Sequence, residues 1–168
     1  MGVKRVWIIE KGNSRWKIGE FNDDALINVT TTDVGVVLTD LNLPQADSKS
    51  IDILITGSGN WSNDTLELLK SKGNVTQLRH GDSHPLRTNV TNPGSLGTDR
   101  IANAFAIQEG VIDKALTGNA WLIVDVGTCV TFDLVVDGTH LGGAISPGIS
   151  LRLDSMRIGI LWFGMKTL

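Results

Sequence analysis

The chain has 168 residues, of which 41% are hydrophobic and 20% charged, enough to bury the core of one ordinary domain or of two small lobes. Its formal net charge of −3 argues against a surface that binds nucleic acid or anionic membranes. One cysteine, Cys129, excludes an internal disulfide and suits a reducing compartment. The N-terminal apolar run Val6–Ile9 is too short for a signal peptide or a membrane span, so we expect a cytoplasmic protein.

The first elements predicted along the chain are strands. The apolar run Val6–Ile9 and the alternating segment Arg15–Phe21 flank a Gly-Asn-Ser turn, a pattern typical of a hairpin. Ser50–Asn60 reads as a buried strand that runs into a Gly-Ser-Gly turn, the usual edge of a ligand cleft in an α/β sheet. The segment before it, Asp33–Pro44, is ambiguous and could open a helix.

A helix follows over Ser62–Asn74, with Ser62 or Asn63 as its cap, leucines on one face and Gly73 at its end. The order of strand, turn and helix indicates parallel strand pairing. We therefore predict a layered α/β fold.

The second half of the chain begins with a loop, His80–Gly97, which is rich in turn formers. Thr98–Gly110 predicts a helix whose apolar, small-residue face suits packing on another helix or on a second subunit. Leu141–Gly148, with three glycines and a proline, fits either a loop that approaches a ligand or an irregular turn. The last residues, Arg157–Leu168, show no periodicity.

The pattern of strand, glycine turn and strand occurs twice. Val6–Phe21 and Trp121–Val136 each carry an acidic residue two places before the turn glycine. Either segment alone is consistent with a plain tight turn, but an acid in register both times favours a shared function. Laid over each other, the hairpins pair Glu10 with Asp125, Gly12 with Gly127 and Asn13 with Thr128.

Such turns point backbone N–H groups to one side, and glycine lets a phosphate approach without a Cβ in the way. The small polar residues Asn13, Ser14 and Thr128 add side-chain donors. The leading carboxylates fit a phosphate only if a cation lies between, and Mg²⁺ is commonly held by one or two carboxylates plus phosphate oxygens. The duplicated hairpin therefore predicts a polyphosphate that both hairpins bind, with the ligand between two lobes.

Asp99 and Arg100 lie at the predicted start of a helix. Asp99 there is either a stabilising first-turn acid or a functional carboxylate. The helix dipole disfavours a cation such as Arg100 in the first turn. A residue that is unfavourable at its position and has no evident stabilising role is often functional. An arginine so placed could hold a carboxylate in a two-pronged contact.

Other chemically interesting side chains have plainer interpretations. The three histidines fall in polar segments with no common metal spacing, so we expect solvated loop residues. Tryptophans near the two hairpins are expected to pack in the core at their bases. These residues are His80, His84 and His140, and Trp7, Trp16 and Trp121.

Four ordered motifs, "EKGNSRWK", "GTDRIANAFA", "VDVGTCVTFD" and "LGGAISPGISL", resemble those of the type III pantothenate kinases over residues 6 to about 155. That family lies in the actin/hexokinase/Hsp70-like superfamily of phosphotransferases, which have two ribonuclease-H-like lobes. The resemblance implies ATP-dependent phosphorylation of pantothenate to 4′-phosphopantothenate, the first step of coenzyme A synthesis. It also implies a homodimer that uses Mg²⁺ and a monovalent cation (K⁺ or NH4⁺).

The resemblance also assigns roles to residues. Gly97, Thr98, Asp99 and Arg100 resemble the pantothenate-binding motif, with Asp99 as the catalytic base and Arg100 on the substrate carboxylate. Asp125 is similar to the monovalent-cation ligand and Thr128 to an ATP-phosphate contact. The first phosphate-binding motif corresponds to Glu10, Lys11, Gly12, Asn13, Ser14, Arg15, Trp16 and Lys17.

The chain departs from the family pattern at three points. Glu10 stands where most members have Asp, and Val90 stands where they usually place a substrate-contacting Tyr. The chain stops at Leu168, so we expect a first lobe over residues 1–96 and a linking helix with a partial second lobe over 97–168. Three alternatives stay open: a non-catalytic regulatory homologue like the Bvg accessory factor, a truncated inactive product, and a sugar or acetate kinase.

Overall fold

A computed structural model describes residues 4–33, 51–57, 59–111 and 117–164 of the chain. The chain divides into two compact units, Met1–Asp82 and Ser83–Leu168, which are described separately below. The boundary expected from the sequence, at residue 96, falls inside the second unit, so the loop before the Gly-Thr-Asp-Arg segment groups with the helix that follows it.

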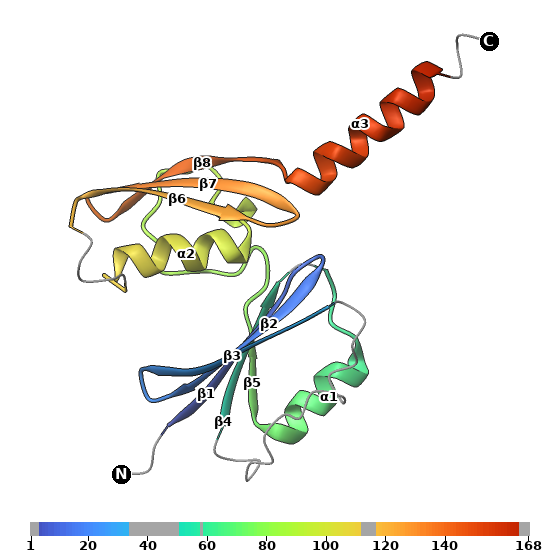
Figure 1. Cartoon of the computed structure of the whole chain (residues 1–168). Helices are drawn as coiled ribbons and strands as arrows, with labels where there is room; N and C mark the ends of the chain where they lie inside the picture. Colours follow the sequence, from blue (N-terminus) through green and yellow to red (C-terminus); the bar gives the residue numbers. More distant parts are fainter. Residues whose placement is uncertain (1–3, 34–50, 58, 112–116, 165–168) are drawn as a thin grey trace. The chain divides into compact units, whose positions relative to one another are not determined.

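The first unit is built on a five-stranded mixed sheet with the order β3-β2-β1-β4-β5 (Figure 1). β1 pairs antiparallel with β2 and parallel with β4, which confirms the parallel pairing predicted from the strand–turn–helix order. The edge strand β3 was not predicted. The strands are β1 (Arg5–Lys11), β2 (Arg15–Asn22), β3 (Ala25–Asp33), β4 (Ile51–Gly57) and β5 (Asn74–Gln77).

Helix α1 (Asn63–Lys72) covers one face of this sheet (Figure 1). Ser62 caps it as predicted, because its Oγ accepts from the Thr65 backbone N–H at 3.2 Å, and Gly73 follows the last turn. The core beneath the helix holds isoleucines from β1, β2 and β4 together with Leu69. Trp7 and Trp16 are buried in it as predicted, and so is Trp61, which the sequence did not single out.

The second unit contains a three-stranded antiparallel sheet in the order β6-β7-β8. The predicted loop before it holds only a short 3-10 helix, η2 (Pro93–Ser95), and an isolated bridge between Thr88 and His140. The remaining elements are α2 (Thr98–Gln108), β6 (Ala120–Val126), β7 (Cys129–Val136), β8 (Thr139–Pro147) and α3 (Ile149–Gly164).

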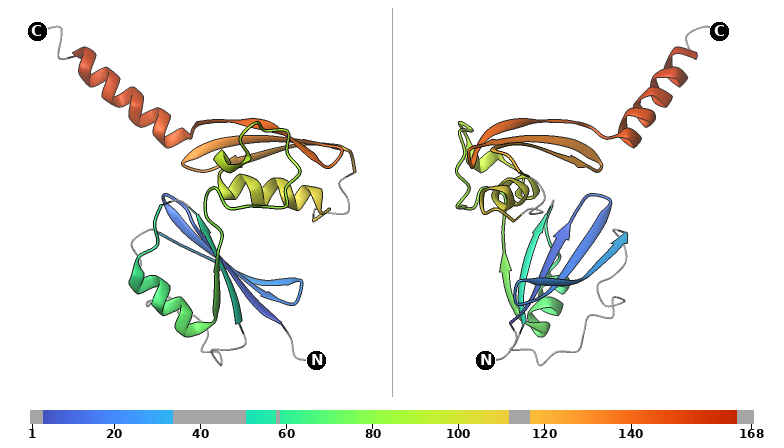
Figure 2. Two further views of the ribbon diagram at one scale, coloured as in Figure 1. Left: turned by 180° about the vertical axis from the view of Figure 1, so that it is seen from behind. Right: turned by 60° about the vertical axis from the view of Figure 1, so that its left-hand side comes forward.

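Helix α2 packs on one face of this sheet, chiefly on β7 (Figure 2). Its buried residues are Thr98, Ile101 and Ala104, and Trp121 of β6 packs against the same cluster as predicted. Of the two predicted partners of α2, another helix or a second subunit, the first is not what this unit shows, because α2 packs on β7 and β6, and the second stays a prediction. The opposite face of the sheet exposes Leu122 and other large apolar side chains.

The segment Leu141–Gly148 was predicted as a loop or an irregular turn, and this is wrong. Residues 141–147 belong to strand β8, which pairs with β7 along its length. The turn between the two strands is Asp137-Gly138, both with positive φ (48° and 69°), the conformation of the tight hairpin turn that such a dipeptide favours. Gly142, also at positive φ (125°), sits where the β7–β8 register shifts.

The C-terminal segment, which showed no periodicity, continues helix α3 as far as Gly164. The side chains described in α3, Ile149–Ile158, are all exposed. No helix in the described part of the chain is long and apolar enough to cross a membrane. Of the ambiguous segment Asp33–Pro44, all but Asp33 lies outside the described residues.

Candidate active site

Helix α2 begins at the Gly-Thr-Asp-Arg segment. Gly97 occupies the N-cap position with φ −61° and ψ 144°, and no side chain caps the helix there. Asp99 lies in the first turn, where the helix dipole and unpaired N–H groups favour a carboxylate. Within the described residues, no group donates a hydrogen bond to the Asp99 carboxylate. Asp99 is thus half-buried yet keeps its capacity to accept a proton or a hydrogen bond.

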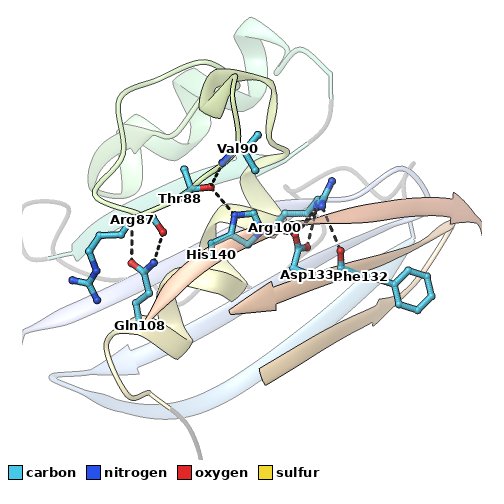
Figure 3. A network of polar contacts seen from close by, with 8 residues as sticks. All are labelled: Arg87, Thr88, Val90, Arg100, Gln108, Phe132, Asp133 and His140. Carbon is cyan, nitrogen blue, oxygen red and sulfur yellow. Dashed lines mark hydrogen bonds and ion pairs between the residues drawn. The ribbon is translucent and has the colours of Figure 1, made fainter. Parts of the chain in front are cut away.

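The neighbouring Arg100 turns its guanidinium onto Asp133 of β7 (Figure 3). Nε donates to Oδ2 at 2.9 Å and Nη2 donates to Oδ1 at 2.7 Å, the two-pronged geometry of a strong charge-assisted pair. The Asp133 side chain is 2% exposed and that of Arg100 15%. The cation that the helix dipole disfavours therefore has an internal partner, a structural gain that the sequence did not reveal.

Arg100 remains cationic in this setting. Its hydrogen bond to Asp133 raises the pKa of the guanidinium above the ordinary value, the charges of Asp133 and Asp99 act in the same direction, and burial opposes them. Because Asp133 is buried, removing either partner would leave the other charge unpaired, which costs on the order of 3–5 kcal/mol. The pair is therefore a fixed feature of the folded unit.

His140 forms a second side-chain hydrogen bond with Asp133. His140 Nε2 lies 2.8 Å from Asp133 Oδ1, and His140 Nδ1 lies 2.9 Å from the Thr88 hydroxyl. Since a carboxylate only accepts, Nε2 carries the hydrogen, and in a neutral imidazole Nδ1 then accepts from the Thr88 hydroxyl. Thr88 Oγ1 in turn accepts from the Val90 N–H at 3.1 Å. Figure 3 shows this chain of contacts from the loop through β8 and β7 to α2.

The prediction that His140 is a solvated loop residue is wrong. Its side chain is 1% exposed, and it lies in strand β8. His80 is exposed as predicted, whereas His84 is half-buried, and its Nδ1 has no hydrogen-bond partner among the described residues.

The loop segment Arg87–Val90 is anchored to β8 and α2. The His140 N–H donates to the Arg87 carbonyl at 2.9 Å, and the Asn89 N–H donates to the His140 carbonyl at 2.9 Å. Gln108, in the last turn of α2, closes the arrangement by donating to the Arg87 carbonyl and accepting from its N–H (Figure 3). The loop beside Val90 is therefore held in a defined position relative to Arg100.

A glycine makes room for the Arg100–Asp133 pair. Gly143 of β8 is the register partner of Asp133, and a Cβ placed on it would collide with the Phe132 carbonyl. The same Cβ would lie 2.6 Å from Arg100 Nη2 and 2.7 Å from Asp133 Oδ1. This close approach explains one of the glycines in the Leu-Gly-Gly motif.

Both predicted hairpins have a hydrogen bond that the turn glycine donates to the second strand. The Gly12 N–H donates to the Arg15 carbonyl at 2.8 Å, and the Gly127 N–H donates to the Cys129 carbonyl at 2.9 Å. In each case the acceptor belongs to the first residue of the second strand. The structure thus confirms a glycine-turn hairpin in each unit, but the two turns differ in length, because the acceptor lies three residues after Gly12 and two residues after Gly127.

The first hairpin gathers charged and aromatic side chains. The Glu10 carboxylate pairs with Lys17 across the strands at 3.2 Å, and both side chains are partly exposed. Lys11 donates to the Asn60 carbonyl at 2.7 Å, and its Nζ lies 5.8 Å from the centre of the Trp61 ring. Trp61 also packs edge-on against Trp16, with centroids 5.1 Å apart. The predicted phosphate motif is therefore packed against an aromatic pair, Trp16 and Trp61.

In the second hairpin, Asp125 lies on the face of the sheet that α2 covers. It is the register partner of Thr131, which is two residues before Asp133 on the same strand and so points to the same face. Gly148, after β8, donates to the Thr128 carbonyl at 2.9 Å, and a Cβ there would collide with the Gly127 and Thr128 carbonyls. The structure therefore brings Asp125, Arg100 and Asp133 to one side of the sheet.

The described residues contain no group of three or more His, Cys, Asp or Glu side chains that could hold a metal ion. Asp125 and Glu10 each offer a single carboxylate within their own unit. That donor set fits a cation that keeps several waters and binds mainly through substrate phosphates, as Mg²⁺ does, rather than a cation caged by protein.

Asp99 and Arg100 stand out in the sequence, but their supporting residues Asp133, His140 and Thr88 were not predicted. Asp133 had a detectable signal, since a lone acid inside the apolar run Phe132–Val136 is expected to be buried and therefore to need a partner. Thr88 carried no sequence signal.

The fold is similar to that of a solved structure. A conserved Baf-family protein from Campylobacter jejuni superposes with a TM-score of 0.50 at 22% identity, over 86% of this chain and 55% of that one. The superposition shows a shared fold, and the layered α/β arrangement predicted from the sequence is confirmed.

The sequence comparisons narrow this class. The family model of type III pantothenate kinases matches residues 6–159, and the chain belongs to that family. The type III pantothenate kinase of Christiangramia forsetii is 38% identical over 89 residues, which are 52% of this chain and 35% of the relative. That of Flavobacterium psychrophilum is 27% identical over 150 residues, 88% of this chain and 60% of the relative. The chain thus spans between 35% and 60% of the length of these two relatives.

Proposed function

We propose that this chain takes part in the ATP-dependent phosphorylation of pantothenate to 4′-phosphopantothenate, the first step of coenzyme A synthesis. The observation that carries the proposal is the start of α2. There an arginine is fixed by a buried partner beside an aspartate that accepts no hydrogen bond from the described residues. Membership of the type III pantothenate kinase family supports the choice of substrate.

In this proposal Arg100 and Asp99 have separate roles. Asp133 occupies Nε and Nη2 of Arg100, and within the described residues Nη1 makes no hydrogen bond, so it can donate to the substrate carboxylate. Asp99 accepts the proton of the 4′-hydroxyl. A carboxylate at a helix start is a weak base, but phosphoryl transfer depends more on positioning and charge neutralisation than on base strength.

The nucleotide side of the proposal rests on the two hairpin turns. Backbone N–H groups at turns with glycine suit phosphate, and Lys11, Lys17 and Thr128 add donors. Mg²⁺, when bound, would neutralise charge on the phosphates, with Glu10 and Asp125 as the carboxylates available to it. In the family resemblance Asp125 serves instead as the ligand of K⁺ or NH4⁺, and binding measurements with each cation would separate the two assignments.

A homodimer, a cytoplasmic location and a division into two ribonuclease-H-like lobes belong to the same proposal. The family resemblance supports the dimer and the lobes, and the single cysteine supports a reducing compartment.

A coupled ADP-release assay with ATP, Mg²⁺ and K⁺ tests the proposal. We expect ADP release that depends on pantothenate and is absent with hexoses or acetate in its place. A folded sample that binds pantothenate but never turns over would favour the regulatory homologue. That alternative has its own support in Val90, which stands where the family usually has a tyrosine.

A further inference from the structure

Arg100 has more N–H donors than Asp133 occupies. A guanidinium has five N–H donors, and Asp133 takes the Nε–H and one hydrogen of Nη2. The second hydrogen of Nη2 is directed to the Phe132 carbonyl at 3.4 Å. Within the described residues, Nη1 therefore carries the donors left for a ligand. The position of Asp133 therefore determines which N–H groups of Arg100 remain for a ligand.

Asp133 is itself held in place. Its Oδ1 accepts from His140 as well as from Arg100, and His140 is fixed at its other nitrogen by Thr88. All three contacts are between 2.7 and 2.9 Å, and the Asp133 and His140 side chains are 2% and 1% exposed. A buried, fully bonded carboxylate has one orientation, so it imposes one orientation on the arginine.

From this geometry we propose that Asp133 and His140 are positioning residues of the carboxylate-binding site. They hold Arg100 with its Nη1 edge toward the substrate, and they make Arg100 select a substrate that ends in a carboxylate. This inference rests on the proposed function, in which Arg100 binds the carboxylate of pantothenate. It adds the residues that give Arg100 its selectivity.

A purely structural role would predict something different. If the network only stabilised the unit, weakening it would lower the melting temperature and leave ligand selectivity unchanged in the protein that remains folded. If it positions Arg100, selectivity falls even in folded protein, because a freed guanidinium loses its fixed direction.

The test compares the dissociation constants of pantothenate and of pantothenol, its alcohol analogue, by calorimetry on the full chain. For the unmodified protein we expect pantothenate to bind at least about tenfold more tightly, as for a hydrogen bond to a charged group. Asp133→Asn should bring the ratio close to one and leave pantothenol binding unchanged. Glu67→Gln is the matched control, since it breaks only the exposed Glu67–Lys70 pair on α1 and should leave the ratio unchanged.

His140 supplies a second pair of variants in case Asp133→Asn does not fold. Gln at this position can still donate to Asp133, whereas Leu cannot, so His140→Gln should keep most of the selectivity and His140→Leu should lose it. Equal ratios for these two variants would overturn the inference, and so would a selectivity that survives Asp133→Asn. An unmodified protein that does not prefer pantothenate would overturn the assignment of Arg100 in the proposed function as well, which separates the two failures.

Discussion

Arg100, in the first turn of α2, and Asp133, in the middle of β7, form a two-pronged ion pair that joins the helix to the sheet at 2.7 and 2.9 Å. The pair explains why a cation occupies the start of a helix. It also attaches the first turn of α2, which contains Asp99, to the sheet.

Asp99→Asn should lower turnover about a hundredfold or more while leaving the melting temperature nearly unchanged. The carboxylate caps nothing within the described residues, so the change removes its favourable interaction with the helix dipole, about 0.3–1 kcal/mol, and its attraction to the Arg100 charge. The coupled assay and a thermal melt measure the two effects. Asp64→Asn is the control, because Asp64 is an exposed first-turn acid of α1 and should show the same small change in stability with full turnover.

Gly143→Ala should destabilise the protein by about 1–3 kcal/mol, as expected when an added group overpacks its surroundings. The added methyl group would meet the Phe132 carbonyl and both members of the Arg100–Asp133 pair. Gly127→Ala is the comparison, since a Cβ there would meet only the Cys129 carbonyl, at 3.7 Å. Chemical denaturation of both variants checks this, and equal stabilities would show that Gly143 is not constrained by the pair.

Glu10→Gln should weaken the binding of Mg²⁺–ATP while changing the free energy of unfolding by less than about 1 kcal/mol. The Glu10–Lys17 pair is partly exposed, and such pairs contribute little to stability. Calorimetric titration with ATP, with and without Mg²⁺, provides the measurement. Glu20→Gln on the neighbouring strand β2, where Glu20 accepts from Asn28, should bind nucleotide normally. If Glu10→Gln binds Mg²⁺–ATP as tightly as the unmodified protein, the role assigned to Glu10 is wrong.

The preference for pantothenate over pantothenol should not change between about pH 6 and pH 9. A group whose pKa is raised on folding loses its contribution only as the pH rises through the folded pKa, and the pKa of Arg100 is raised from a value already far above this range. Binding titrations across the window test this. A preference that falls toward pH 9 would mean that another group recognises the carboxylate.

The sequence revealed the parts of the fold whose signals are local. The capped helix α1, the two glycine-turn hairpins and the buried strand β4 follow from periodicity, capping residues and turn formers, and the structure has each of them. The strand β3 escaped because it is largely exposed, so no alternation of apolar and polar residues marks it.

The site shows the same division. Asp99 and Arg100 stood out because a cation at a helix start breaks a local rule. His140 was misplaced because the Asp137-Gly138 turn signal was overlooked, and that turn puts the histidine in a strand instead of a loop. The contacts of Asp133 with Arg100 and His140 join residues 33 and 7 positions apart in the chain and depend on tertiary packing, which sequence periodicity does not encode.

A crystal structure of this chain with bound pantothenate tests the central claim most directly. The account predicts a carboxylate oxygen of pantothenate within hydrogen-bond distance of Arg100 Nη1, the 4′-hydroxyl beside the Asp99 carboxylate, and an intact Arg100–Asp133 pair. Pantothenate bound away from the start of α2, or an Arg100 that leaves Asp133 to reach its ligand, would contradict it.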